Sequence, residues 1–180
     1  MNYLLDTSAV LAHFRREPGH EQVQELFQDA TASILLSAPT LLEMDVALKP
    51  RIPDEGERHE VVEFYGGRLA EVVSVDSTAV EKAIVLKNAS SRRIPAMDAL
   101  VAGCALAHSA TLVHRDPHFD AIPPERLQVL RLNDRPESAT SHEAPPAVRE
   151  TSAGYVTHKR TKSRSSVRTR KSQRTAKQGA

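Results

Sequence analysis

The sequence predicts an α/β fold in which helices cover both faces of a mostly parallel central sheet. Short apolar runs alternate with amphipathic segments through residues 1–134, and strands separated by helices are typical of parallel sheets. The chain has 40% hydrophobic residues but no Trp and few aromatic residues, so its core must consist mainly of aliphatic side chains. We therefore expect a three-layer α/β/α sandwich.

The expected elements follow one another in a regular order. Five short apolar runs are expected to be strands: 3–5, 33–39, 71–75, 111–114 and 127–132. Between them, segments with apolar residues at helical spacing are expected to be helices: 8–14, 21–30, 40–49, 55–69, 77–88 and 94–109. Pro50 ends the third of these helices, and no internal repeat is visible.

The C-terminal part of the chain differs in composition. Residues 151–180 contain nine Lys or Arg and no acidic residue, which leaves 15 basic against 23 acidic residues in 1–150. Residues 135–180 are rich in Ser, Thr, Pro, Lys and Arg and lack apolar periodicity. We expect a folded domain over 1–134 and a disordered basic tail over 135–180. The tail is either a solvated extension, a binder of nucleic-acid phosphates or a segment that folds back onto the acidic domain.

Composition also bounds the cellular setting. Cys104 is the single cysteine, which excludes an intramolecular disulfide and a cysteine-based metal cluster and suits a reducing compartment. No apolar run is long enough to cross a bilayer, and no basic segment precedes the apolar stretch at the N-terminus. We expect a cytoplasmic protein without a secretory signal or membrane contact.

Two carboxylates follow predicted strands. Asp6 ends the first strand, and Asp116 follows the strand 111–114 after a single residue. The carboxyl ends of parallel strands meet at one edge of a sheet, where open α/β folds bind their ligands. We therefore expect both side chains at the same edge.

Two further carboxylates lie on predicted helices. Glu43 has Val46 and Ala47 at the following turn, which predicts that it faces the protein, whereas Asp45 is expected to be a surface charge facing Lys49. Asp98 lies in the first turn of a helix that is otherwise too apolar to be a surface helix.

Four carboxylates that converge from residues 6, 43, 98 and 116 could not all stay ionised without a counter-charge. Oxygen ligands favour Mg²⁺ or Mn²⁺, and such an ion can promote phosphodiester hydrolysis. Each residue also has a simpler interpretation. Asp6 and Asp98 are both suited to the start of a helix, Glu43 to a helix surface, and Asp116 to a turn before Pro117.

Three other residues are expected to be structural. His108 ends a helix, where a cation suits the dipole, and His114 lacks the paired spacing of a zinc site. Cys104 is expected to be a small buried hydrophobic residue.

Several segments together resemble one known family. "YLLDTSAVLAHF", "SAPTLLEMDVAL", "IPAMDALVAGCALAHSATLVHRDPHFDAI" and "LQVLRL" occur in order over residues 1 to about 134. They resemble the PIN domain, and more narrowly the VapC-type toxins of bacterial toxin–antitoxin systems. The combination of the "DTS" opening with the "DALVAGCALAHSATLVHRD" segment is more specific than either alone.

The resemblance implies roles for individual residues. Asp6, Glu43, Asp98 and Asp116 match the four acidic positions that hold Mg²⁺ or Mn²⁺ for RNA cleavage, and Ser8 matches a supporting polar position. It also implies a parallel sheet flanked by helices, a homodimer, and a cognate antitoxin. The antitoxin would insert a C-terminal segment at the active site, often with an Arg that faces the carboxylates.

The sequence departs from this family in two places. His118 stands where another acid often precedes the Phe, which affects the binding of a second metal, and the basic tail has no counterpart in compact toxins. Two functions therefore compete: a metal-dependent endoribonuclease toxin, and a catalytically weak or inactive nucleic-acid-binding protein that uses its tail. A flavodoxin-like signalling receiver is disfavoured because the lysine expected near a late strand is missing.

Overall fold

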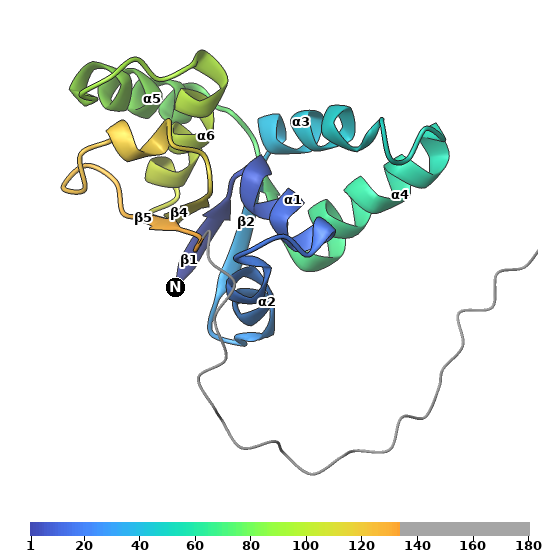
Figure 1. Cartoon of the computed structure of the whole chain (residues 1–180). Coiled ribbons are helices and arrows are strands. Elements are labelled where there is room, and N and C mark those ends of the chain that lie inside the picture. The colour runs from blue at the N-terminus through green and yellow to red at the C-terminus, as the bar shows by residue number, and fades with distance from the viewer. Residues whose placement is uncertain (134–180) are drawn as a thin grey trace, which may run out of the picture. The chain divides into compact units, whose positions relative to one another are not determined.

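The computed structural model describes residues 1–133 of the chain. The predicted tail 135–180 lies outside the described residues. Within them, all five predicted strands form one parallel sheet: β1 (Asn2–Leu5), β2 (Ser33–Ser37), β3 (Glu71–Val73), β4 (Thr111–His114) and β5 (Val129–Arg131). Their order is β3-β2-β1-β4-β5, with β1 at the centre (Figure 1). The predicted fold class is confirmed.

In the described part of the chain, six α-helices connect the strands: α1 (Thr7–Arg15), α2 (His20–Gln28), α3 (Ala38–Leu48), α4 (Glu55–Phe64), α5 (Ser77–Ala89) and α6 (Ala96–Ala107). The predicted helix 55–69 changes at Tyr65 into a π-helical turn, Tyr65–Leu69, and a short 3₁₀ helix forms at Phe119–Ala121. The side chains of Asp54 and Asp76 cap α4 and α5 by accepting hydrogen bonds from backbone N–H groups.

Among residues 1–133, none of the helices has the length and apolar character needed to cross a membrane.

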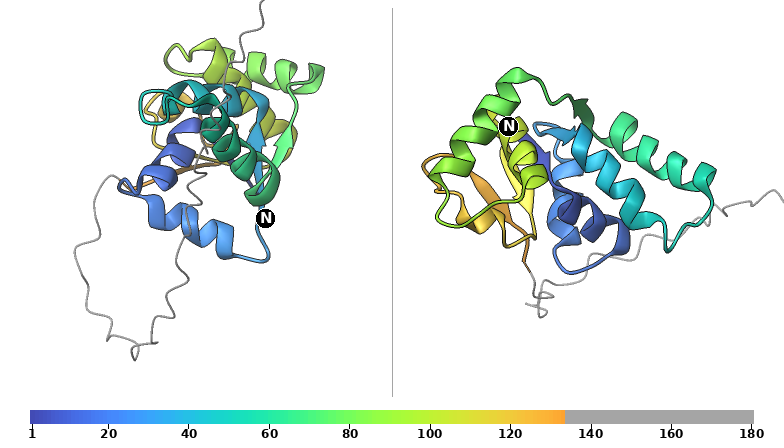
Figure 2. Two further views of the ribbon diagram at one scale, coloured as in Figure 1. Left: turned by 90° about the vertical axis from the view of Figure 1, so that its right-hand side faces the viewer. Right: turned by 90° about the horizontal axis from the view of Figure 1, so that it is seen from above.

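The two faces of the sheet bury separate cores. Leu4 and Leu112 point toward α5 and α6, whereas the next residues along the same strands, Leu5 and Val113, point toward α1–α4. Figure 2 shows the sheet between these two groups of helices. Alternation along each strand therefore produces the three layers, and it leaves the carboxyl ends of β1 and β4 side by side.

Helices α5 and α6 approach each other closely at Gly103. A Cβ at this position would lie 2.8 Å from the Cβ of Ala83 and would clash with the backbone oxygen of Ala79. Only glycine allows this spacing. The close approach holds α6 against α5 and thereby fixes the start of α6, where Asp98 lies.

Candidate metal centre

Asp6 is both a helix cap and a wall of the site. It follows the last residue of β1 and caps α1, and its Oδ2 accepts bonds from the backbone N–H of Ser8 at 3.0 Å and from Ser8 Oγ at 2.6 Å. Its side chain is only 5% exposed. Burial raises the pKa of Asp6 to about 6 despite the Ser8 hydrogen bonds, which favour the carboxylate, and the charge of Glu43 raises it further.

Ser8 joins two strand ends. Besides donating to Asp6, its Oγ accepts a 2.9 Å hydrogen bond from the backbone N–H of Arg115, just after β4. The backbone N–H of Asp6 also donates to the carbonyl of Val113 at 2.9 Å. Ser8 therefore holds the Asp6 carboxylate beside the end of the neighbouring strand, which agrees with the supporting role expected for it.

Glu43 reaches the same edge from α3. The hydroxyl of Thr7 donates a 2.7 Å hydrogen bond to Glu43 Oε2. Glu43 was expected to face the protein because Val46 lies at the next turn of the helix. This reason was wrong, because Val46 is 62% exposed. The partner expected for Asp45 was also wrong: Asp45 accepts a 2.7 Å ion-pair hydrogen bond from Nε of the buried Arg58 on α4.

Asp98 lies in the first turn of α6, as expected, with Pro95 before the helix. Its Oδ2 atom is buried and lies 3.0 Å from Nδ1 of His118, which pairs with it. Burial raises the pKa of Asp98, and the charges of Asp116 and Glu43 raise it further, while His118 opposes them. Two like charges beside a partly buried carboxylate favour a cation at this point.

His118 lies between two of these carboxylates. Its Nδ1 is 3.0 Å from Asp98 Oδ2 and 3.1 Å from Asp116 Oδ1, and its backbone N–H donates to Asp116 Oδ1 at 2.8 Å. One ligand atom from each of the three residues lies within 4.8 Å of the others. Sequence reasoning identified His118 as a departure from the family pattern but did not place its ring inside the cluster.

The four predicted carboxylates approach one another to different degrees. Electrostatic interactions link Asp6 to Glu43, Glu43 to Asp98, and Asp98 to Asp116, so all four share one electrostatic environment. Asp6 and Glu43 lie outside the compact group that Asp98 and Asp116 form with His118. A joint set of four metal ligands stays a prediction.

The residues expected to be structural have the expected environments. His114 is fully buried, and its Nδ1 donates a 2.8 Å hydrogen bond to the carbonyl of Asp116. Burial lowers the pKa of His114. Cys104 is buried in α6, and His108 lies just beyond the last residue of this helix.

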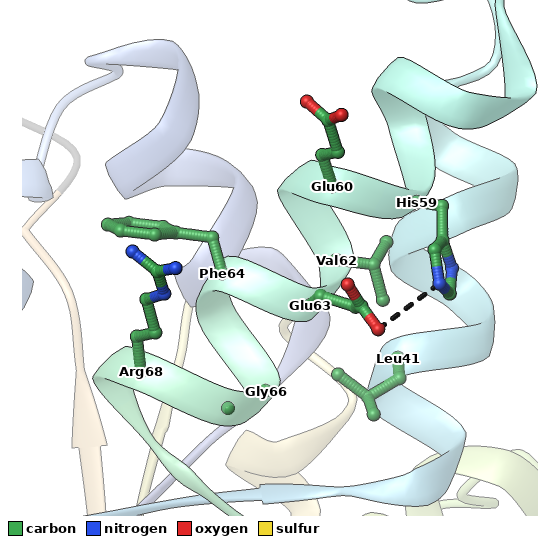
Figure 3. A pocket seen from close by; sticks show the side chains of 9 residues that line it. Leu41, His59, Glu60, Val62, Glu63, Phe64, Gly66 and Arg68 are labelled. Carbon is green, nitrogen blue, oxygen red and sulfur yellow. Dashed lines mark ion pairs between the residues drawn. The ribbon is translucent and has the colours of Figure 1, made fainter.

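An open groove of about 740 Å³ lies between α3 and α4 and contains none of the four carboxylates. Figure 3 shows Leu41 and Val62 within it, the ring of Phe64 beside the guanidinium of Arg68, and the ion pair between His59 and Glu63. The His59 and Glu63 side chains are 3.2 Å apart, one helical turn from each other. The groove thus combines an apolar floor with charged margins.

The PIN domain family model matches residues 3–124 of this chain. The chain belongs to the PIN domain family. Among curated proteins, no sequence matches it significantly.

Solved structures share the fold at low sequence identity. One is VapBC2 from Rickettsia felis bound to a DNA fragment from its promoter, with 20% identity, a TM-score of 0.59, and coverage of 74% of this chain and 100% of that chain. A toxin–antitoxin complex from Klebsiella pneumoniae has 19% identity, a TM-score of 0.54, and coverage of 71% and 95%. VapBC-5 from Mycobacterium tuberculosis has 19% identity, a TM-score of 0.54, and coverage of 73% and 98%. At these identities the likeness concerns the fold.

Proposed function

We propose that this PIN domain protein is a metal-dependent endoribonuclease and the toxin of a VapC-type toxin–antitoxin pair. The observation that carries the proposal is the group of Asp98, Asp116 and His118 at the carboxyl edge of the sheet, with Asp6 and Glu43 coupled to it by charge. The membership of the PIN family and the fold shared with toxin–antitoxin complexes support the same function.

The residues present fit a small divalent cation. The buried Asp98 Oδ2 atom faces the half-exposed ring of His118, and the possible ligand atoms are mainly carboxylate oxygens, which Mg²⁺ and Mn²⁺ prefer. We assign Asp98 and Asp116 as the primary ligands, with Asp6 and Glu43 completing the negative site. A bound cation would supply positive charge to a phosphoryl oxygen and lower the pKa of an attacking water.

The protein's own residues prepare this site before any ligand arrives. Ser8 holds the Asp6 carboxylate in one orientation, and Thr7 does the same for Glu43. The N-terminus of α6 favours the negative charge of Asp98.

The direct test is cleavage of total RNA by the purified full-length protein in Mg²⁺ or Mn²⁺. We expect cleavage that EDTA abolishes and that added Mn²⁺ restores. Asp98→Asn is expected to lose cleavage, whereas Glu81→Gln, which removes an exposed carboxylate from α5, keeps it. RNA binding without cleavage in any metal would contradict the nuclease and support the alternative of a catalytically inactive binding protein. Deletion of 135–180 would then show whether the tail carries that binding.

We also propose two protein partners. The apolar floor and charged margins of the groove between α3 and α4 suit a segment of a cognate antitoxin, and Asp98 and Asp116 suit an Arg from it. Exposed apolar side chains on α3 and α5, including Leu42 and Ile84 at 59% and 55% exposed, suit a second copy of the chain.

These partners can be tested separately. Phe64→Asp in the groove is expected to weaken binding of the protein encoded by the adjacent reading frame and to leave the dimer intact. Ile84→Asp is expected to shift the sedimentation coefficient toward a monomer, and a wild-type protein that sediments as a monomer would contradict the dimer.

A further inference from the structure

His118 places a nitrogen donor inside a site that otherwise offers oxygen. Its Nδ1 is 3.0 Å from Asp98 Oδ2 and 3.1 Å from Asp116 Oδ1. Adjacent ligands of an octahedral cation at about 2.1 Å are about 3 Å apart. The distance from His118 Nδ1 to each carboxylate oxygen therefore matches that between neighbouring ligands of one ion, as well as that of an ion pair.

The local backbone holds His118 in this position. Its backbone N–H donates to Asp116 Oδ1 at 2.8 Å, across Pro117. This hydrogen bond keeps the Asp116 carboxylate close to the ring of His118. The next residue, Phe119, is fully buried and contacts the ring of His114 edge-on, with ring centroids 5.1 Å apart. The buried Phe119 thus fixes the turn, while the half-exposed His118 ring (51%) remains accessible to an ion from solvent.

The Nδ1 atom of the nearby His114 is not available as a second metal ligand. Its Nδ1 donates to the carbonyl of Asp116 at 2.8 Å, and the side chain is fully buried. Among residues 1–133, His118 is the histidine that forms a group with two carboxylates at ligand spacing.

Resting on the metal site proposed above, we propose that His118 Nδ1 is a ligand of the bound ion and biases the site toward Mn²⁺ over Mg²⁺. Mg²⁺ binds almost only oxygen and keeps much of its water, whereas imidazole nitrogen suits transition metals. The preference for Mn²⁺ arises because His118 supplies nitrogen where a carboxylate would supply oxygen. His118→Asp places a carboxylate there and should reduce this preference.

Pulsed electron paramagnetic resonance of bound Mn²⁺ tests the ligand directly, without RNA or activity. Untagged full-length protein is loaded with less than one equivalent of Mn²⁺, and modulation from a coordinated ¹⁴N nucleus is recorded. We expect this modulation in wild type and its loss in His118→Ala and His118→Asp. The control His108→Ala removes an exposed imidazole beyond the opposite end of α6, about 15 Å along the helix, and should keep the modulation.

Calorimetric titration then tests selectivity. We expect the ratio of the Mg²⁺ to the Mn²⁺ dissociation constant to fall about tenfold in His118→Asp relative to wild type, the scale of effect that residues tuning a metal site have. Tight Mn²⁺ binding with no His118-dependent nitrogen signal, or an unchanged ratio, overturns this inference and leaves the nuclease intact. Absence of any Mn²⁺ or Mg²⁺ binding overturns the metal site itself.

Discussion

The two halves of the acidic cluster are built in different ways. The Asp6 half, consisting of Asp6 and Glu43 with their donors, is held by hydrogen bonds from Ser8 and Thr7, which reach one oxygen of each carboxylate. The Asp98 half, consisting of Asp98, Asp116 and His118, is more exposed, and the ring of His118 faces a carboxylate oxygen of each acid.

This difference separates two tasks. Hydroxyl donors fix a carboxylate in position, whereas a half-exposed imidazole that faces two carboxylates can join them in binding an ion. We infer that the Asp6 half positions and charges the site and that the Asp98 half exchanges ligands. The predictions below test this division.

The largest effect is expected at the Asp98 half. Asp98→Asn keeps the size of the side chain but removes its charge, and we expect RNA cleavage to fall by roughly 10²–10³-fold, as for loss of one strong electrostatic contact. Rates in saturating Mn²⁺ measure it, with far-UV circular dichroism to verify the fold. Full activity in this variant would break the proposed division.

The second effect concerns the buried charge of the Asp6 half. The folded-state pKa of Asp6 is about 6 against an ordinary 3.8, so its contribution to stability is present below 3.8 and is lost as pH rises through 6. Asp6→Asn removes this charge and keeps a good N-cap. Without metal at pH 8, we expect the variant to exceed wild type in unfolding free energy by up to about 3 kcal/mol.

Urea denaturation in EDTA at several pH values between 4 and 8 measures this difference. Curves for wild type and Asp6→Asn should diverge as pH rises and become parallel above 7. Equal pH dependence of the two proteins would show that Asp6 is not strained by burial.

The sequence predicted the sheet and its helices because these depend on local patterns. The carboxylate after β1 and most of the strand predicted over 33–39 are readable without knowing the packing. The end of that strand was wrong, because Ala38 and Pro39 begin α3, where proline suits the first turn. Contacts between helices were not readable. Asp45 pairs with Arg58 from α4 rather than with Lys49, because spacing within one helix says nothing about a neighbouring helix.

His118 shows the same limit at the site. Its sequence position marked an unusual residue, but its ring faces Asp98, which lies 20 residues earlier on α6. Only the packing of α6 beside the turn after β4 brings the two together. The sequence could therefore point to the candidate residues, but it could not show how the cluster divides into the Asp6 half and the Asp98 half.

A third prediction concerns the placement of the Asp98 half. Gly103→Ala adds a Cβ that meets the Ala79 carbonyl and Ala83, and overpacking of this kind costs about 2 kcal/mol in unfolding free energy. Gly67→Ala is the matched control, because nothing lies within 4 Å of its added Cβ. Urea denaturation should show loss for the first variant and little change for the second.

The smallest effect is expected at Thr7. Thr7→Val removes the hydroxyl that donates to Glu43, and we expect metal affinity to weaken by about tenfold, as for other residues that orient a metal site. Thr7→Ser keeps the hydroxyl and should bind metal as wild type does. Calorimetric titration with Mn²⁺ measures both, and equal weakening in the two variants would assign Thr7 a packing role.

The central claim is that carboxylates from separate segments form one site for a divalent cation. The most direct measurement is the melting temperature of the full-length protein at pH 8 with and without Mn²⁺. Binding at one hundred times the dissociation constant stabilises a protein by about 2.7 kcal/mol, so we predict a rise of several degrees for wild type and none for the Asp98→Asn, Asp116→Asn double variant. An unchanged wild-type melting temperature, or the same rise in the double variant, would contradict the claim.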